Sequence, residues 1–387
     1  MRKTYLPYAR HWIDSQDIAA VKETLASDWI TTGPMVEKFE QAFRKYIGTG
    51  FAVAVSSGTQ ALDLSLSSLG LKPGDEVITT PLTFCATADA ICYQGARPVF
   101  VDIIEETLNI DPQRIIKEIN SRTKVIIPVD IAGQPCEMNE IMAIARRNNL
   151  KVVEDAAHSL GARIKNKKIG QFADLTTFSF HAVKNMTTAE GGMVGTDDES
   201  LYTRIRRNRF FGLDRSSQER HGGKASWFYE KVDLGRKANM SDISASLGLS
   251  QLKKLDSFLA RRRENARLYE KGLKEVEEIE TPEEVKGTTQ SWHLYIIRLR
   301  LNKLRVKRDE IFKALRQENI GVNVHYRPLH LHRYYQTRFG YKEGDFPVAE
   351  KCFYSIMTLP LFAAMTKRDV RDVIKAVKKV CNYYRKR

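Results

Sequence analysis

Short β-type runs alternate with helical stretches over residues 50–200, and this alternation restricts the fold more than any other feature. VAVSS (53–57) precedes a helical stretch, and the same order repeats after EVITTP (76–81). Strands that recur with intervening helices form βαβ units and a mostly parallel sheet. The other predicted elements are RPVFVDI (97–103), a helix near 112–120, KVIIPVDIAG (124–133), an amphipathic helix at 137–149, KVVEDAA (151–157) and DLTTFSFHAVK (174–184). Ligands bind such sheets beyond the carboxyl ends of the strands.

The remainder of the chain predicts long helices and a second, smaller domain. Helical sequence covers 198–212 and 241–273, and the second stretch is long enough to link two domains. Beyond it we expect a strand at 292–300, a helix at 308–321, a short strand at VNVHYRP (322–328) and a final helix from Lys367. At 387 residues the chain suits two or three domains. We predict a large domain over 1–250, including the N-terminal segment, and a smaller α/β domain over 251–387.

Composition indicates a globular protein, with 42% hydrophobic and 28% charged residues. The N-terminus lacks the apolar core of a signal peptide, and no apolar run approaches the length needed to span a bilayer. The five cysteines are scattered and form no C-x-x-C pair, as expected for reduced thiols. We therefore expect a cytoplasmic protein that does not bind a membrane.

The net charge of +15 is compatible with three interpretations. Nucleic-acid binding is one, but the basic residues are interleaved with acids and apolar positions, and no zinc-finger, RRM or helix-turn-helix pattern accompanies them. Attraction for an anionic ligand, such as a cofactor phosphate or a nucleotide diphosphate, fits as well. A basic proteome or plain solubility explains the charge equally. We predict no nucleic-acid partner.

Lys184 stands in a context that suits a reactive amine. It follows a strand-like run and precedes Gly191-Gly192, where glycines allow close backbone approach before MVGT resumes a strand. Asp155 ends an apolar strand, and Ser57-Gly58-Thr59 opens a helix after another. An amine for a Schiff base, a carboxylate for a pyridinium nitrogen and a helix N-terminus for a phosphate are the groups that a pyridoxal-phosphate (PLP) enzyme requires.

Each of these motifs also has an ordinary structural interpretation. Ser-Gly-Thr before a helix is a common cap, and an Asp at a strand end can cap the next helix. His158 is one helical turn beyond Asp155 and can touch the cofactor ring or serve only the core. Phe84 can stack on the pyridine face or pack internally. The histidine-rich segment 324–335 lacks Cys and acidic ligands at metal-binding spacing, so we predict no metal and assign His325 and Tyr326 to substrate hydrogen bonding.

Taken together and in this order, the motifs resemble the DegT-type (DnrJ/StrS) sugar-nucleotide aminotransferases, which have the aspartate-aminotransferase architecture, fold type I. The resemblance covers nearly the whole chain. The matching segments are SDWITTGP (27–34), AVSSGTQAL (54–62), GDEVITTPLTFCATADAI (74–91), VFVDI (99–103), IIPVDIAGQPC (126–136), VVEDAAHSLGA (152–162), FSFHAVKNMTTAEGG (178–192), KANMSDISASLGLSQLKKLD (237–256) and WHLYIIRL (292–299).

The resemblance implies a role for each matched residue. Lys184 would hold PLP covalently, Asp155 would pair with the pyridine nitrogen, Phe84 would stack on the ring and His158 would lie against it. The phosphate would be bound by Ser57, Gly58, Thr59 and Ser179, with Asn239 reaching it from the neighbouring subunit. A homodimer with the active site at the subunit interface is implied. Thr31, Thr32, His325 and Tyr326 would line the sugar-nucleotide pocket.

The resemblance also implies a ping-pong transamination from L-glutamate to a nucleotide-linked keto sugar, with the closest likeness to enzymes that aminate C4 of UDP-linked sugars. GQPC (133–136), WFYEKVDLG (227–235) and GYKEGDFPVAE (340–350) favour the precursor of pseudaminic acid, whereas HAVKN (181–185) and FFGLDR (210–215) favour 4-amino-4-deoxy-arabinose. The alternatives are a dTDP-linked or C3-keto sugar, or a PLP-dependent sugar dehydratase. Family members that dehydrate sugars carry histidine at the lysine position, so Lys184 favours transamination.

Overall fold

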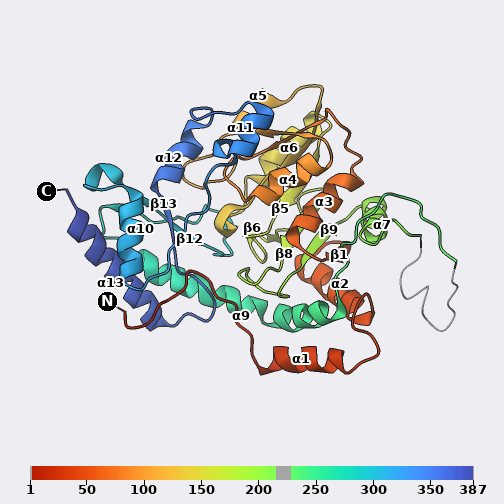
Figure 1. Ribbon diagram of the computed structural model, residues 1–387, viewed down its shortest axis with the longest axis horizontal. Helices are drawn as coiled ribbons and strands as arrows, with labels where there is room; N and C mark the ends of the chain where they lie inside the picture. The colour runs from red at the N-terminus through yellow and green to blue at the C-terminus, as the bar shows by residue number, and fades with distance from the viewer. Residues whose placement is uncertain (1, 215–227, 387) are drawn as a thin grey trace.

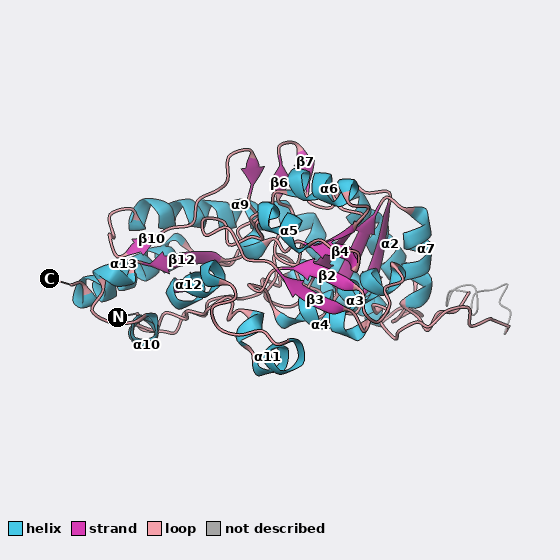
Figure 2. Cartoon of the chain, turned by 90° about the horizontal axis from the view of Figure 1, so that it is seen from above, coloured by secondary structure: helices cyan, strands magenta, loops and turns pink. Residues whose placement is uncertain are grey.

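The computed structural model describes residues 2–214 and 228–386. Arg215 of the segment FFGLDR (210–215) and Trp227 of the segment WFYEKVDLG (227–235) lie outside the described residues. Two bodies follow one another along the long axis, one around a large sheet and one around a small sheet (Figures 1 and 2). Helix α9 (Asp242–Leu273) runs beneath both of them (Figure 1).

A seven-stranded sheet forms the centre of the larger body, in the order β1-β9-β8-β5-β4-β2-β3. Every neighbouring pair is parallel except those that β9 makes with β1 and β8, so the prediction of a mostly parallel sheet is confirmed. The strands are β1 (Phe51–Val55), β2 (Glu76–Thr79), β3 (Arg97–Phe100), β4 (Thr123–Ile127), β5 (Lys151–Asp155), β8 (Leu175–Ser179) and β9 (Gly192–Thr196).

Helices cover both faces of this sheet because its strands are apolar on both sides. One face packs on α3 (Gly58–Ser68), α4 (Cys85–Tyr93) and α7 (Glu199–Asn208). The other packs on α2 (Pro34–Ile47), α5 (Pro112–Glu118), α6 (Met138–Arg147) and the first half of α9. Helix α1 (Ser15–Leu25) lies along the outside of α9, and its first turn is closed by a capping box between Asp14 and Asp17.

The smaller body contains the antiparallel sheet β10-β12-β13 and the second half of α9. Its apolar core is shared with α10 and α13, and Leu6 from the N-terminal segment is buried in it. The elements are β10 (Ile279–Glu280), β12 (Tyr295–Leu299), β13 (Ile356–Leu359), α10 (Arg308–Gln317), α11 (Arg333–Phe339), α12 (Pro347–Ser355) and α13 (Lys367–Tyr384), with 3₁₀ turns η1 (Ile131–Gly133), η2 (Leu301–Lys303) and η3 (Leu329–Leu331). A third small sheet joins β6 (Arg163–Ile164), β7 (Lys167–Lys168) and β11 (Thr288–Thr289).

Two predicted strands differ from the structure. The run 174–184 is a strand only to Ser179, because the backbone then turns, with the N–H of Lys184 donating to the carbonyl of His181. VNVHYRP (322–328) is not a strand; it contributes one bridge, between Asn323 and Thr358, and the strand of the small sheet is β13. The predicted division at residue 250 stays a prediction, and α9 crosses that position without a break.

Candidate active site

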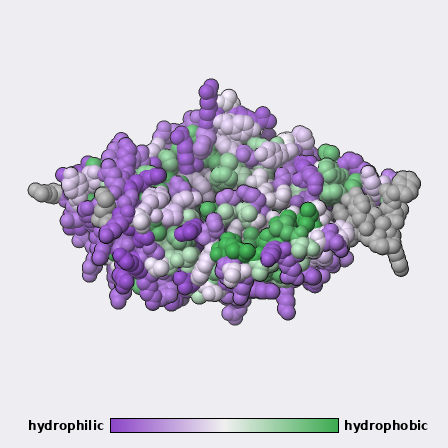
Figure 3. Space-filling model, turned by 60° about the horizontal axis from the view of Figure 1, so that its bottom comes forward, coloured by the Kyte–Doolittle hydropathy of each residue, from purple (hydrophilic) through white to green (hydrophobic). Residues whose placement is uncertain are grey.

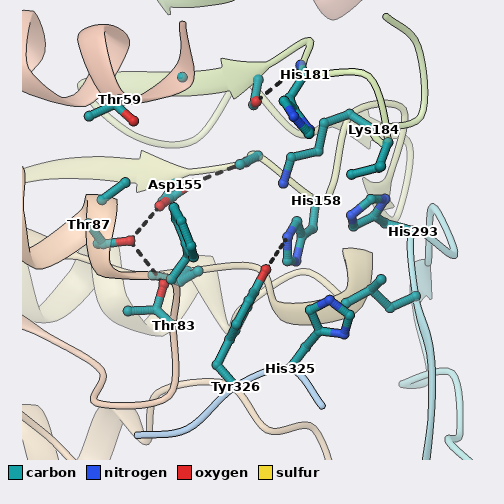
Figure 4. Close-up of a pocket in the computed structure, with 18 of the residues that line it drawn as sticks. Thr59, Thr83, Thr87, Asp155, His158, His181, Lys184, His293, His325 and Tyr326 are labelled. Carbon is teal, nitrogen blue, oxygen red and sulfur yellow. Dashed lines mark hydrogen bonds between the residues drawn. The ribbon is translucent and has the colours of Figure 1, made fainter. Parts of the chain in front are cut away.

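A cavity of about 440 Å³ opens where the carboxyl ends of the large-sheet strands meet the smaller body. Its wall includes most of the residues singled out from the sequence, and Figure 4 shows the central ones. They are Ser57, Gly58, Thr59, Phe84, Asp155, His158, Ser179, Lys184, His325 and Tyr326. The structure therefore brings together residues that are far apart in the chain.

The N-terminus of α3 forms one side of the cavity. Ser57 caps the helix, its hydroxyl oxygen accepting from the N–H of Gln60 at 3.1 Å. The N–H groups of Gly58 and Thr59, at the first two positions, have no intrahelical partner to bind. A Cβ at Gly58 would come within 2.8 Å of Ser179 Cβ, so glycine lets the helix end approach the end of β8. This arrangement is a cradle for an anion.

Asp155 is buried at the end of β5 and is held by two hydrogen bonds. Thr87 donates to its Oδ2 at 2.8 Å, and the N–H of Ala157 donates to Oδ1 at 3.2 Å. Thr83 lies 2.9 Å from Thr87, so a short chain of hydroxyls leads to the carboxylate (Figure 4). Burial raises the pKa of Asp155, and the bond from Thr87 and the charge of Lys184 work against that rise. A buried acid of this kind is suited to pair with a protonated ring nitrogen.

Lys184 extends from the turn after β8 into the cavity (Figure 4). Burial lowers the pKa of its ammonium group to about 8, while the charge of Asp155 opposes the shift. At that pKa about a tenth of the side chain is free amine at pH 7, and the free amine is the form that acts as a nucleophile or base. Lys184 is the single lysine or arginine among the described residues that line the cavity.

Aromatic and imidazole side chains close the opposite side. The hydroxyl of Tyr326 lies 3.2 Å from Nε2 of His158, and the ring of Phe84 stands 6.0 Å from that of Tyr326. Nδ1 of His325 lies 2.8 Å from the Thr358 hydroxyl. Burial, followed by the charge of Lys184, lowers the pKa of His158 well below its usual value and that of His325 to about 4. Both rings are therefore uncharged at neutral pH.

Three predicted residues lie outside this wall. Thr31 is exposed, and Asn239 donates to the hydroxyl of Thr32 at 2.9 Å. None of the three lines the cavity of its own chain. The prediction that Asn239 serves a neighbouring subunit, and the substrate role of Thr31 and Thr32, stay predictions.

Tyr8, Thr83, Thr87 and His293 are among the wall residues that the sequence reasoning missed. Thr83 and Thr87 are four residues apart across the start of α4, a spacing that places them on one side. That signal was present in the sequence. The ring of Tyr8 lies tilted against that of His325 with centroids 5.5 Å apart, and the ring of His293 lies 4.3 Å from that of His158. These two contacts are formed between distant segments, and no local pattern predicts them.

The residues present fit PLP. The free N–H groups and glycine of the α3 cradle suit a phosphate, Asp155 suits a ring nitrogen, and Lys184 reaches the space between them. Among the described residues no group of three or more His, Cys, Asp or Glu side chains is placed to hold a metal ion. The described helices include none that is long and apolar enough to cross a bilayer.

Comparison with known proteins agrees with this geometry. The model of the DegT/DnrJ/EryC1/StrS aminotransferase family matches residues 11–378. The chain belongs to this family. It is 44% identical over 380 residues to the spore coat polysaccharide biosynthesis protein SpsC of Bacillus subtilis, covering 98% of both chains.

Two solved structures of aminotransferases are similar to this chain over nearly their whole length. One is the PLP-form of the sugar aminotransferase Spr1654 from Streptococcus pneumoniae, with a TM-score of 0.91, 34% identity and coverage of 98% and 99% of the two chains. The other is Helicobacter pylori PseC, an aminotransferase involved in the biosynthesis of pseudoaminic acid, with a TM-score of 0.92, 31% identity and coverage of 99% and 100%. The protein is a PLP-dependent sugar aminotransferase of fold type I.

Proposed function

We propose that this aminotransferase moves the amino group of L-glutamate to the C4 ketone of a UDP-linked keto-deoxy sugar. The main support for transamination is the position of Lys184, an amine with a lowered pKa that lines the same cavity as Asp155. The sugar assignment rests on the subgroup segments and on the likeness to PseC. A dTDP-linked or C3-keto substrate, or a dehydration, is the alternative.

The side chains divide the chemistry among them. When bound, PLP supplies a carbonyl that links to amines and an electron sink for the adjacent carbon. Nζ of Lys184 takes a proton from the α-carbon of glutamate in the first half-reaction and delivers one to the sugar carbon in the second. Asp155 keeps the ring nitrogen protonated, and the α3 cradle fixes the phosphate. His325 and Tyr326 orient the sugar, and Thr31 and Thr32 contact the sugar bound in the partner subunit's cavity.

We further propose a homodimer in which Asn239 reaches the phosphate site of the partner subunit. Asn239 and Thr32 lie together yet do not line the cavity of their own chain, which supports a function across an interface. Exposed apolar side chains, among them Ile13, Ile18 and Leu25, occur on the segment that includes α1. Figure 3 has apolar residues gathered on the side of the molecule where α1 lies. We propose a cytoplasmic role in making nucleotide sugars for a polysaccharide.

The deciding experiment is the absorbance spectrum of the purified protein before and after addition of L-glutamate. Conversion of the lysine-linked cofactor band to the amine form supports glutamate as the donor; an unchanged spectrum contradicts it. UDP- and dTDP-linked 4-keto and 3-keto sugars are then supplied with ¹⁵N-glutamate, and the masses of the products are measured by mass spectrometry. A ¹⁵N-labelled UDP-4-amino sugar supports the proposal, whereas loss of water without gain of nitrogen establishes the dehydratase alternative.

A further inference from the structure

Arg262, in the middle of α9, is a buried cation without a carboxylate partner. Its side chain is 2% exposed, and it forms no ion pair within residues 2–214 and 228–386. Burial lowers the pKa of the guanidinium to about 10, so it remains charged at neutral pH. Placing such a charge in the interior is costly unless hydrogen bonds compensate for the lost water. The contacts that compensate it indicate what the residue does.

All of its hydrogen bonds go to main-chain carbonyls of the smaller body. Nη1 donates to the carbonyls of Trp292 and His293 at 3.2 Å each and to that of Leu361 at 2.9 Å. The first two carbonyls lie just before β12, and the third lies just after β13. The guanidinium of Arg262 therefore holds the start of β12 and the end of β13, which lie side by side in the small sheet.

The segment that Arg262 holds is packed directly behind His158. The hydroxyl of Ser291 donates to the carbonyl of His158 at 2.7 Å, and the N–H of Ser291 donates to the carbonyl of Gly133 at 3.1 Å. The ring of His293 lies beside that of His158, with centroids 4.3 Å apart (Figure 4). His293 is 4% exposed and lines the cavity.

The His293 ring is uncharged in this setting. Burial, followed by His158, Lys184, Arg262 and His325, lowers its pKa well below the usual value. These groups come from four segments that surround the ring. An uncharged ring packs against His158 without repelling it, which leaves Nε2 of His158 near the Tyr326 hydroxyl.

We propose that Arg262 is a positioning residue for the amino transfer and acts through His293. Arg262 fixes the main chain of His293, and the His293 ring holds the His158 ring in its position beside Lys184 and Tyr326. The role of the ring is packing, so an aromatic replacement preserves it. The inference uses the established aminotransferase activity and does not depend on which sugar is the substrate.

The neighbouring arginine supplies a matched control. Arg261 donates to the carbonyls of Ala363 and Met365 and stacks on Trp12, away from the cavity. Both arginines tie α9 to the smaller body, but only Arg262 reaches Trp292 and His293. Lysine keeps the charge at either position, but its ammonium group is carried on a shorter side chain, so at residue 262 it does not reach the three carbonyls that Nη1 binds.

Four variants test the proposal: Arg262→Lys, Arg261→Lys, His293→Ala and His293→Phe. We expect kcat to fall about 10- to 100-fold in Arg262→Lys and His293→Ala, with KM for the keto sugar changed by less than about threefold. Arg261→Lys and His293→Phe keep kcat within about threefold of wild type. The double variant Arg262→Lys/His293→Ala falls no further than the worse single variant, because both act through one ring.

A second readout needs neither cofactor nor substrate. In cofactor-free protein with ¹⁵N-labelled histidine, the side-chain NMR signals of His158 shift in Arg262→Lys and His293→Ala and stay in place in Arg261→Lys. Additive losses in the double variant, or an equal loss in Arg261→Lys, overturn the proposal. If Arg262→Lys does not fold, unchanged kcat and His158 signals in His293→Ala overturn it as well.

Discussion

The hydroxyl of Tyr326 lies 3.2 Å from Nε2 of His158, and this contact joins the two bodies of the molecule across the cavity. Tyr326 comes from the segment after α10, and His158 follows β5 of the large sheet. His158 is buried and Tyr326 is half-buried, and both line the cavity. The contact is one of those that hold the smaller body against the large sheet at the cavity.

Removal of that hydroxyl tests the contact. Tyr326→Phe leaves Nε2 of His158 without its partner, which costs about 1–3 kcal/mol for a buried polar group. We expect kcat/KM for the keto sugar to fall about 10- to 100-fold, since a 1.4 kcal/mol loss is tenfold. The half-reaction with glutamate, followed by absorbance, separates a sugar-specific loss from a general one. An unchanged kcat/KM contradicts a functional role for the contact.

Asp155→Asn removes the charge that we propose pairs with the ring nitrogen, and it keeps the shape of the side chain. We expect cofactor to bind but turnover to fall by about two orders of magnitude or more, because electrostatic stabilisation of the reacting centre is lost. Single-turnover rates with glutamate measure this directly. Thr87→Val is the milder companion variant, since it keeps the Asp155 carboxylate and removes the hydroxyl that contacts Oδ2 and Thr83. Equal rates in Asp155→Asn and wild type contradict the assignment.

The pKa of about 8 for Lys184 predicts how cofactor-free protein captures PLP. Only the free amine attacks the cofactor carbonyl, and its fraction grows as pH rises toward 8 and levels off above it. The rate at which the lysine-linked absorbance band appears should therefore increase about tenfold per pH unit well below 8 and reach a plateau above. Lys184→Ala develops no such band yet binds the cofactor by equilibrium dialysis. A rate that is independent of pH between 6 and 9 contradicts the shifted amine.

Local patterns predicted the elements that build the site, and long-range packing determined the rest. β5 ends at Asp155 and α3 begins at Gly58, as the apolar run and the Ser-Gly-Thr turn indicated. The strand predicted through Lys184 ends early because the chain turns after Ser179. The N–H of Phe180 donates a hydrogen bond to the carbonyl of Gly191, and the N–H of Lys184 donates to the carbonyl of His181. His293 was missed because only the fold brings it to His158.

The excess of basic residues is distributed unevenly along the chain. Residues 251–387 contain 31 lysines and arginines against 17 acids, whereas residues 1–250 contain 31 against 30. Much of the excess lies on outer surfaces such as the exposed side of α13, with Arg368, Arg371, Lys375 and Lys378. The net charge of +15 therefore does not describe the cavity, whose described wall contains one lysine and no arginine.

Two buried acids beneath the site make stability depend on pH. Asp130 accepts from the Ser159 hydroxyl at 2.5 Å, and Glu154 accepts from the Thr176 hydroxyl at 3.1 Å. Burial raises the pKa of both above the unfolded value, so their ionisation disfavours the folded state. The free energy of unfolding should therefore fall as pH rises from the unfolded pKa toward the folded one.

Glu154→Gln tests this relationship. We expect the variant to lose less stability than wild type between pH 5 and pH 8, by about 1.4 kcal/mol for each unit of raised pKa. Urea unfolding of cofactor-free protein at both pH values measures the difference. A pH dependence that is the same in both proteins contradicts the shift at Glu154.

The proposed active site at a dimer interface predicts that the Lys184→Ala and Asn239→Ala variants restore each other's activity. A hybrid dimer of Lys184→Ala and Asn239→Ala subunits has one site with both residues intact and one with both changed. Random exchange makes half of the dimers hybrid, so activity should return to about a quarter of wild type. The matched control mixes Lys184→Ala with Asp155→Asn, two residues of the same chain's cavity, for which no hybrid contains an intact site. Recovery in neither mixture, with exchange confirmed by mass spectrometry, places Asn239 outside the partner's site; recovery in the first alone locates it there.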